Sequence, residues 1–308
     1  MLPTVNLCFG LLYVLYSSVS LFMHAVVCWA LISAPHFKKH VALRMMLFLS
    51  LSDALQLVIH LFCGILILSS STINLTINQW IGFLALTLWN ATIFQQTTLA
   101  VNRFYVLIRN QFSVPNPRSI NLMIAMSWIG ALLLQVGYHS QGDRFYFSPE
   151  IVNWLEDVDH TILFLLMRYF KIVCLIVGLI AGVGMFLCVI YQNCSTRPGH
   201  PKNRIHTSTE MRLFIQTCCS PLLGLINLFI WTYFSQQVAN GGIVAQGLVN
   251  FEWILINGIH PYISIVFAKK LRNAVAELLG LKRSSNTKLN SVLYLTRWSR
   301  IRPSHEDG

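Results

Sequence analysis

Seven apolar stretches separated by short polar segments dominate the pattern of hydrophobic and polar positions along this chain of 308 residues. A helix that crosses a bilayer needs about 20 mainly apolar residues, because each residue rises about 1.5 Å across a hydrocarbon core of about 30 Å. The pattern therefore predicts a bundle of seven membrane-spanning helices. The expected spans are Phe9–Ser33, Arg44–Leu68, Trp80–Leu107, Ile120–Val136, Met167–Tyr191, Leu213–Phe234 and Val244–Ala268.

The chain changes character after the seventh stretch, where it becomes basic and amphipathic. The apolar positions of this segment fall on one helical face: Leu271, Val275, Leu278 and Leu279. Such a pattern is typical of a short helix that lies on a membrane surface. We expect residues 1–279 to form one seven-helix domain that ends with this helix. Residues 280–308 are expected to form a basic, disordered tail that is attracted to anionic lipid of the inner leaflet.

Lysine and arginine are distributed unevenly between the two sides that seven spans create. With the N-terminus outside, 19 of the 22 cations fall in inner segments and in the C-terminal tail. Arg144 falls in an outer loop, and Arg168 and Lys171 fall at the outer end of the fifth stretch. Because cytoplasmic loops carry the excess of these residues, the count predicts an outside N-terminus and a cytoplasmic C-terminus.

Two features of the expected outer loops follow from this orientation. The sequon Asn74-Leu75-Thr76 lies in the first outer loop, where glycosylation of Asn74 is topologically allowed. Trp154 lies in the long connection between the fourth and fifth stretches, and we expect it to anchor the chain at the membrane interface.

Composition agrees with a membrane protein and narrows the classes of function. Hydrophobic residues make up 55% of the chain and charged residues 11%, whereas a soluble domain is roughly 25% charged. The net charge of +11 is explained by cations placed beside apolar spans, so we expect no nucleic-acid partner. The eight cysteines show no C-x-x-C spacing and no histidine cluster, so neither a metal site, nor a disulfide scaffold, nor a cofactor is expected.

Ionisable residues inside the spans are the strongest candidates for a functional site. A charged side chain at the bilayer centre costs about 2.5–3.5 kcal/mol on insertion scales, so such residues usually face the bundle interior. Asp53, with His60 two turns further along the same face, is interpreted as an ion-binding or conformational-switch acid; a carboxylate satisfied by neighbouring polar side chains is the alternative. Glu252, Arg168 and Lys171 are candidates to line a ligand cavity, and a headgroup position is the alternative for the two cations.

Two prolines interrupt predicted spans, Pro221 in the sixth and Pro261 in the seventh. Each removes a backbone hydrogen bond and tends to kink its helix. A kinked helix can act as a pivot or can be static, and the sequence leaves both interpretations open. Asn257 and His260 lie beside the second kink, and we expect them to satisfy the carbonyl groups that it frees.

The third stretch ends in Asn102-Arg103-Phe104. Alone, Arg103 is equally well explained as a side chain that reaches the inner headgroups. Together with seven spans, an outside N-terminus and an inner amphipathic helix, the motif resembles the rhodopsin-like G-protein-coupled receptors. Asp53 matches the second-span acid of that superfamily, and Arg103 matches the arginine of its D-R-Y motif. Pro221 and Pro261 match the prolines of C-W-x-P and N-P-x-x-Y.

Departures from these motifs narrow the resemblance. Asn102 replaces the acid of D-R-Y, Cys219 the tryptophan of C-W-x-P, and His260 and Ser264 the asparagine and tyrosine of N-P-x-x-Y. The second outer loop lacks cysteine, so the usual bridge from the third span to that loop cannot form. With these departures the chain is similar to the class T and class X families of nematode serpentine chemoreceptors. The similarity includes the segments Leu99-Ala100-Val101-Asn102-Arg103 and Ile256-Asn257-Gly258-Ile259-His260-Pro261.

The resemblance implies a receptor for small environmental or pheromone-like molecules, displayed on the plasma membrane of sensory neuron cilia and signalling through heterotrimeric G proteins. Eight residues precede the first stretch, so we expect the ligand to bind in a cavity between helices. Ligand would favour a state in which the sixth span pivots at Pro221 and opens an inner cleft beside Arg103. Because Asn102 carries no charge, the inactive state should be weakly locked and the basal signal high.

Other classes of membrane protein fit the sequence less well. A seven-span ligand-gated channel with a cytoplasmic N-terminus contradicts the cation count, and a transporter would show an internal repeat. A membrane enzyme would need a cluster of ionisable side chains on its inner loops, where the histidines are scattered, so no enzymatic activity is expected. A receptor-like protein that no longer couples to a G protein remains an alternative.

Overall fold

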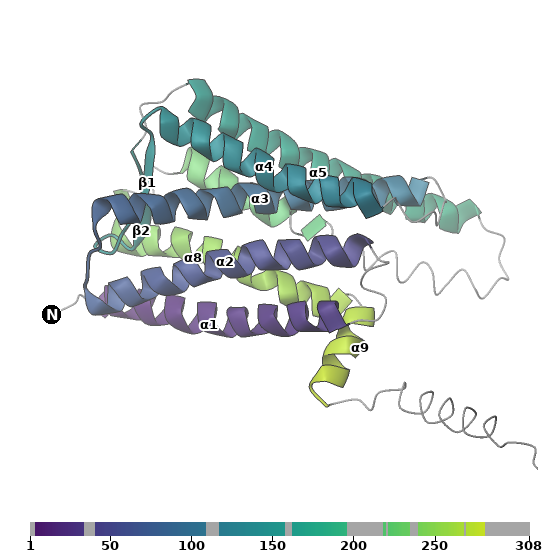
Figure 1. Cartoon of the computed structure of the whole chain (residues 1–308), viewed down its shortest axis with the longest axis horizontal. Coiled ribbons are helices and arrows are strands. Elements are labelled where there is room, and N and C mark those ends of the chain that lie inside the picture. Colours follow the sequence, from purple (N-terminus) through teal and green to yellow (C-terminus); the bar gives the residue numbers. More distant parts are fainter. Residues whose placement is uncertain are drawn as a thin grey trace, which may run out of the picture.

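The fold is an elongated bundle of long helices with a small β-hairpin at one end (Figure 1). The computed structural model describes residues 4–33, 41–108, 117–157, 162–195, 218–219, 221–234, 240–267 and 269–280. Its labelled helices are α1 (Thr4–Ser33), α2 (Val41–Ser69), α3 (Leu75–Ile108), α4 (Pro117–Ser140), α5 (Ile162–Ser195), α8 (Gly242–Phe267) and α9 (Lys269–Leu278). A shorter apolar helix over Pro221–Tyr233 is called the sixth helix below.

These helices confirm the predicted spans. Most begin before and end after the apolar stretches, because helical hydrogen bonding continues where side chains become polar. The sixth helix covers the second half of the expected span Leu213–Phe234, and residues 213–217 lie outside the described residues. Within the described ranges, five helices are long and apolar enough to cross a membrane: α1, α2, α4, α5 and α8.

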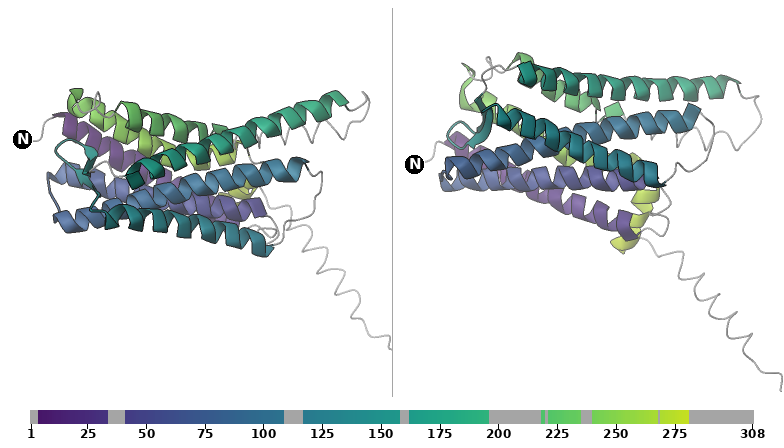
Figure 2. Two further views of the ribbon diagram at one scale, coloured as in Figure 1. Left: turned by 90° about the horizontal axis from the view of Figure 1, so that it is seen from above. Right: turned by 45° about the horizontal axis from the view of Figure 1, so that its top comes forward.

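Helix α3 is less apolar than these five because polar side chains run along its buried face. Asn90, Thr92, Gln95 and Gln96 are all at most 5% exposed. Helix α3 runs between α2, α4 and α5, as both views of Figure 2 show. A helix in this position faces protein on most sides, so its polar groups meet other side chains rather than lipid.

The outer surface of the bundle is apolar, and its interior contains many polar side chains beside its hydrophobic clusters. Leu15, Leu133 and Ile180 are about two-thirds exposed, at 64–65%, whereas Ser17 and Asn257 are fully buried. A water-soluble helical protein has the opposite arrangement, since its core is apolar and its surface polar. The distribution therefore requires lipid around the helices, and the chain is a multi-pass membrane protein.

Glycines allow the helices to approach one another closely, as small residues do in membrane bundles. A Cβ atom at Gly64 of α2 would lie 2.9 Å from Cγ2 of Val14 in α1. A Cβ atom at Gly258 of α8 would lie 2.6 Å from Oγ of Ser20, also in α1. Helix α1 therefore packs against both α2 and α8, which brings the polar faces of these helices together.

The connection between α4 and α5 contains a β-hairpin that the sequence analysis did not predict. Strand β1 (Arg144–Ser148) pairs antiparallel with β2 (Asn153–Asp157), with Phe147 opposite Trp154. Trp154 is 1% exposed and packs against Phe145, with ring centroids 5.0 Å apart. The expectation that Trp154 anchors the chain at the membrane interface is therefore wrong, because the hairpin folds inward over the bundle.

Helix α9 turns away from the bundle axis after α8 (Figure 1). Leu271 and Val275 are buried in a cluster that includes Val27 and Leu31 of α1. Nη1 of Arg272 donates to the carbonyl oxygen of Val266 at 2.7 Å, which satisfies a group left free at the end of α8. The predicted amphipathic helix is thus present, and the expected tail from residue 281 onward lies outside the described residues.

Candidate functional site

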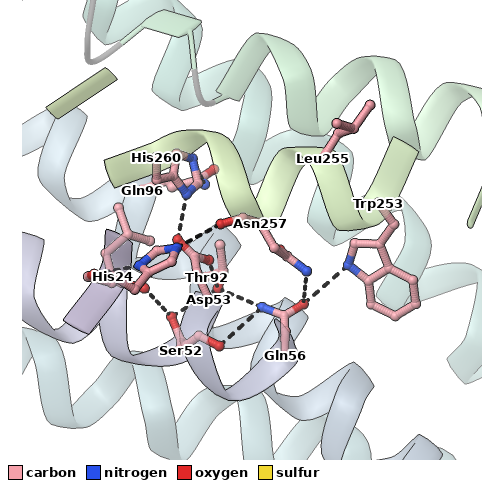
Figure 3. Close-up of polar contacts among 12 residues, drawn as sticks. His24, Ser52, Asp53, Gln56, Thr92, Gln96, Trp253, Leu255, Asn257 and His260 are labelled. Carbon is pink, nitrogen blue, oxygen red and sulfur yellow. Dashed lines mark hydrogen bonds and ion pairs between the residues drawn. The ribbon is translucent and has the colours of Figure 1, made fainter. Parts of the chain in front are cut away.

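Asp53 is fully buried in the middle of the bundle, between α2, α3 and α8 (Figure 3). Its Oδ2 atom lies 2.5 Å from Nδ1 of His260, and its Oδ1 accepts a hydrogen bond from Oγ1 of Thr92 at 3.2 Å. Nε2 of His260 in turn lies 3.2 Å from Nε2 of Gln96. With the amide as donor to Nε2, the imidazole proton is on Nδ1 and is donated to Asp53. Through these contacts the carboxylate of Asp53 in α2 is bonded to Thr92 in α3 and to His260 in α8.

Gln56 extends this network toward the end of the bundle that carries the hairpin (Figure 3). Its Nε2 donates to Oγ1 of Thr92 at 3.2 Å. Its Oε1 accepts hydrogen bonds from Nε1 of Trp253 at 3.2 Å and from Nδ2 of Asn257 at 3.3 Å. A continuous chain of hydrogen bonds therefore runs from Trp253 through Gln56 and Thr92 to Asp53.

The kink at Pro261 is stabilised by a residue that the sequence analysis missed. Proline has no N–H, so the carbonyl oxygen of Asn257, four residues earlier, loses its helical partner. Nε2 of His24 in α1 lies 2.9 Å from this oxygen, and its Nδ1 lies 2.6 Å from Oγ of Ser50. The expectation that Asn257 and His260 satisfy the freed carbonyl is wrong, because their side chains point to Gln56 and Asp53 instead. A buried histidine in an apolar span was the available signal for His24.

His60 does not join the network, although it lies two turns from Asp53. Its ring packs edge-on against Trp253, with centroids 4.9 Å apart, and also contacts Trp154. It therefore belongs to an aromatic cluster under the hairpin.

A cavity of about 60 Å³ lies on the hairpin side of the network. Its wall includes the aromatic side chains of Trp89, Phe145, Trp231 and Trp253 beside polar and charged ones. Residues of α3, α4, the hairpin, α5, the sixth helix and α8 all contribute to it. Because Trp253 lines this cavity and also donates to Gln56, the cavity is in direct contact with the polar network.

The three residues predicted to line a ligand cavity come together at this place. Arg168 and Lys171 line the cavity directly, and Nη2 of Arg168 lies 3.9 Å from Oε2 of Glu156 in β2. Glu252 contributes indirectly, because its Oε2 accepts a hydrogen bond at 2.7 Å from Nδ2 of Asn227, which lines the cavity. In the described part of the chain, Lys171 forms no hydrogen bond or salt bridge, and the charged groups near it are Glu156 and Arg168.

The two prolines border a second, smaller cavity on the other side of the network. Pro221, Pro261, Gln96 and His260 all line this space of about 30 Å³, roughly the share of liquid volume that one water molecule takes. Both prolines therefore lie next to the same gap in the packing.

The other predicted site residues lie at the two ends of α3. Asn102 and Arg103 are half-buried in its last two turns, apart from the Asp53 network. Asn74 is exposed just before α3, and its Oδ1 accepts a hydrogen bond from the Thr76 N–H at 2.9 Å, as a helix cap does. Among the described residues, no three His, Cys, Asp or Glu side chains come together as ligands for a metal ion.

Comparisons with known proteins agree with this architecture. The chain is similar in fold to the crystal structure of squid rhodopsin, with a TM-score of 0.75 and 14% sequence identity over 90% of this chain and 86% of that chain. A search of curated proteins gives no match. The model of the serpentine type seven-transmembrane chemoreceptor family Srx matches residues 14–268, which include the polar network, the cavity beside the hairpin and both prolines. The resemblance to serpentine chemoreceptors is confirmed, and the chain belongs to the Srx family of seven-transmembrane G-protein-coupled chemoreceptors.

Proposed function

We propose that this receptor binds a small molecule in the outer cavity and passes the signal through the Asp53 network to a G protein at the inner end of α3. The observation that carries this proposal is the double role of Trp253. Its ring lines the cavity, and its N–H donates to Gln56 at 3.2 Å. A ligand that moves this ring also disturbs the hydrogen bonds that hold α2, α3 and α8 together.

The lining of the cavity supports a ligand with an apolar body and an acceptor or anionic group. Trp89, Trp231 and Trp253 offer aromatic surface, and the ammonium group of Lys171 offers a charge without an ion-pair partner among the described residues. Environmental or pheromone-like small molecules with such a group fit this chemistry. The ligand is therefore expected to lose affinity when Lys171 is made neutral.

The size of the cavity supports a conformational response to the ligand. A volume of about 60 Å³ holds only a few heavy atoms, so a larger ligand must displace part of the wall. Trp231 and Asn227 belong to the sixth helix, whose first residue Pro221 borders the inner cavity. Ligand would push the outer part of this helix away from α5, and the helix would pivot beside Pro221.

At the inner end, Arg103 is the proposed contact for the G protein. Asn102, the residue before Arg103, carries no charge and cannot form an ion pair with it, so we expect a basal signal. The orientation that this requires has the N-terminus outside and α9 at the inner leaflet near anionic lipid. It is supported by the excess of lysine and arginine in the segments on the α9 side, since the hairpin and the start of α1 lie at the opposite end (Figure 1). We assign the receptor to the plasma membrane of sensory neuron cilia.

The test is G-protein activation by the expressed receptor, with tags on both termini to report surface delivery and orientation. Arg103→Ala is expected to abolish the basal signal, and Asn102→Asp is expected to lower it because a carboxylate would pair with the arginine.

Arg44→Ala is the matched control, since it removes another cation, bonded to Asn121 of α4, and should leave the signal intact. A basal signal that survives Arg103→Ala contradicts the proposed mechanism. A cytoplasmic N-terminus would favour the channel instead, and correct topology without signal would favour a receptor that no longer couples.

A further inference from the structure

The β-hairpin forms part of the wall of the outer cavity. Phe145 of β1 and Glu156 of β2, which face each other across the hairpin, both line it. Phe145 stacks on Trp154, and Trp154 packs against Trp253 with ring centroids 6.1 Å apart. The position of the hairpin therefore sets the shape of the cavity, and whatever holds the hairpin also controls the ligand site.

Strand β1 is held on α3 by a single side chain that makes two hydrogen bonds. Nδ2 of Asn78 donates to the carbonyl oxygen of Phe147 at 2.7 Å, and Oδ1 of Asn78 accepts from the N–H of Phe147 at 3.0 Å. Asn78 is 7% exposed and Phe147 1%. The amide thus satisfies both backbone groups of one buried strand residue, as a neighbouring strand would, and we call this contact the Asn78 clamp.

A second contact one helical turn further along α3 fixes the direction of the strand. A Cβ atom at Gly82 would overlap the carbonyl oxygen of Phe145, so only glycine lets β1 lie this close to the helix. Four helix residues rise about 6 Å, and two strand residues span about 6.6–6.8 Å. Asn78 with Phe147 and Gly82 with Phe145 are therefore two matched steps of one continuous strand-on-helix contact.

The loop of the hairpin is held from the other side by α1. Val152 has a φ of +59°, a conformation that is strained for a β-branched residue and persists only where neighbours impose it. The carbonyl oxygen of Val152 lies 3.3 Å from the hydroxyl oxygen of Tyr13, which also donates to Gly247 of α8 at 2.7 Å. The hairpin thus contacts both α1 and α3, and its strong hydrogen bonds to a helix are the two from Asn78.

No covalent bond can take over this function, because the sequence has no cysteine between Cys63 and Cys174. We propose that Asn78 is the positioning residue of the ligand site: the Asn78 clamp holds the hairpin over the cavity without a covalent bond. The role in ligand binding rests on the function proposed above. The clamp itself does not, since it can be measured without a ligand or a G protein.

Hydrogen exchange of the hairpin tests the clamp in the purified full-length receptor. Two buried hydrogen bonds are lost in Asn78→Ala, so peptides over residues 143–157 are expected to exchange about tenfold faster than in the parent. Asn153→Ala is the matched control. It removes an equally buried amide from β2 whose Oδ1 has no hydrogen-bond partner among the described residues, and it should leave the exchange of β1 unchanged.

Asn78→Asp separates the hydrogen bonds of residue 78 from its bulk. A charged carboxylate keeps the acceptor for the Phe147 N–H but repels the Phe147 carbonyl oxygen. A protonated carboxyl group donates to that oxygen and restores both bonds. Protection of the hairpin relative to the parent is therefore expected to be lost at pH 7 and regained at about pH 4, where aspartate titrates. The pH dependence of hydrogen exchange in Asn78→Asp therefore tests the Asn78 clamp even if Asn78→Ala does not fold.

Access to the cavity tests the consequence for the ligand site. In a Lys171→Cys receptor, a water-soluble thiosulfonate should modify the new thiol at least about fivefold faster when Asn78→Ala is added, because the hairpin then opens more often. Modification of the parent, which keeps Lys171, gives the background from natural cysteines.

The outcomes are distinct from those of the signalling test. Unchanged hairpin exchange in Asn78→Ala, or protection in Asn78→Asp that is independent of pH, overturns the clamp. Faster exchange with unchanged access to Cys at position 171 overturns the positioning role. Faster exchange and faster access support the proposal even if the receptor activates no G protein, in which case only the proposed function fails.

Discussion

The Asp53–His260 pair shows what a single buried charge does in this bundle. A carboxyl group in an apolar interior is costly unless hydrogen bonds compensate for the water that it loses. Here Thr92 and His260 supply these contacts, and the two partners come from different helices. The pair therefore fixes the relative position of α2 and α8, and a change in the pair has to alter how these helices pack.

We expect Asp53→Asn and His260→Asn to be coupled in their effect on stability. Removing one partner leaves the other buried without its hydrogen bond, which costs about 1–3 kcal/mol. The double variant places two neutral amides side by side, so its loss of stability should be smaller than the sum of the single losses by at least about 1 kcal/mol. Thermal unfolding of the purified receptor in detergent measures this. Asp53→Asn combined with His60→Asn is the control and should be additive, since His60 contacts Trp253 instead. Equal coupling in both cycles would count against the pair.

At the same scale, the sequence identifies charged residues better than it identifies their partners. Asp53, Arg168 and Lys171 stand out because charge is rare in an apolar span, and the structure places all three inside the bundle or at its cavity. His24 stands out less, because its role exists only through the carbonyl oxygen of Asn257, more than 200 residues away. Such a contact depends on how α1 packs on α8, which no local pattern contains.

Helix α8 shows how an element depends on its neighbours. It continues as a helix through Pro261 although one of its hydrogen bonds is missing. The bond from His24 replaces the missing one, and the network around Gln56 and Asp53 holds the helix on both sides of the kink. The kink is therefore a joint between α8, α1 and α2 and has few ways to move alone.

A double-variant cycle tests this dependence. His24→Leu leaves the carbonyl oxygen of Asn257 without a donor and should cost about 1–3 kcal/mol. In a Pro261→Ala receptor the new N–H at position 261 can bond to that oxygen, so His24→Leu should cost clearly less. The measurement is again thermal unfolding, with His24→Gln as the conservative variant that keeps a donor. The same loss for His24→Leu in both backgrounds would show that the histidine does not support the kink.

Elements also differ in how far their own sequence determines them. The spans are predictable because a bilayer demands about 20 apolar residues from each helix. The hairpin is not, since each strand has five residues and its position comes from Asn78 and Gly82 of another element. An aromatic residue such as Trp154 then looks like an interface anchor, when it is in fact buried by a fold-back that the local pattern does not encode.

On the scale of the whole molecule, the chain has two distinct ends. The start of α1, the loop before α3 and the hairpin lie at one end, and α9 lies at the other (Figure 1). Arg44 and Arg272 lie on helices at the α9 end, and most lysines and arginines fall in segments expected on that side. Cations in this arrangement favour the cytoplasmic side of a membrane. The proposed orientation therefore has the α9 end inside and the hairpin end outside. In that orientation the cavity beside the hairpin lies in the outer half of the bundle.

Two sequons on opposite ends give this orientation a test that needs neither ligand nor G protein. Asn74 is exposed before α3, and Asn193 begins the sequon Asn193-Cys194-Ser195 near the end of α5. Glycans are added on the outer side only, so an outside N-terminus predicts that Asn74→Gln removes a glycosidase-sensitive shift on a gel and that Asn193→Gln changes nothing. The inverted orientation predicts the reverse for the two variants. A shift that depends on Asn193 would therefore invert the assignment of inner and outer ends, and with it the proposal that Arg103 faces a G protein.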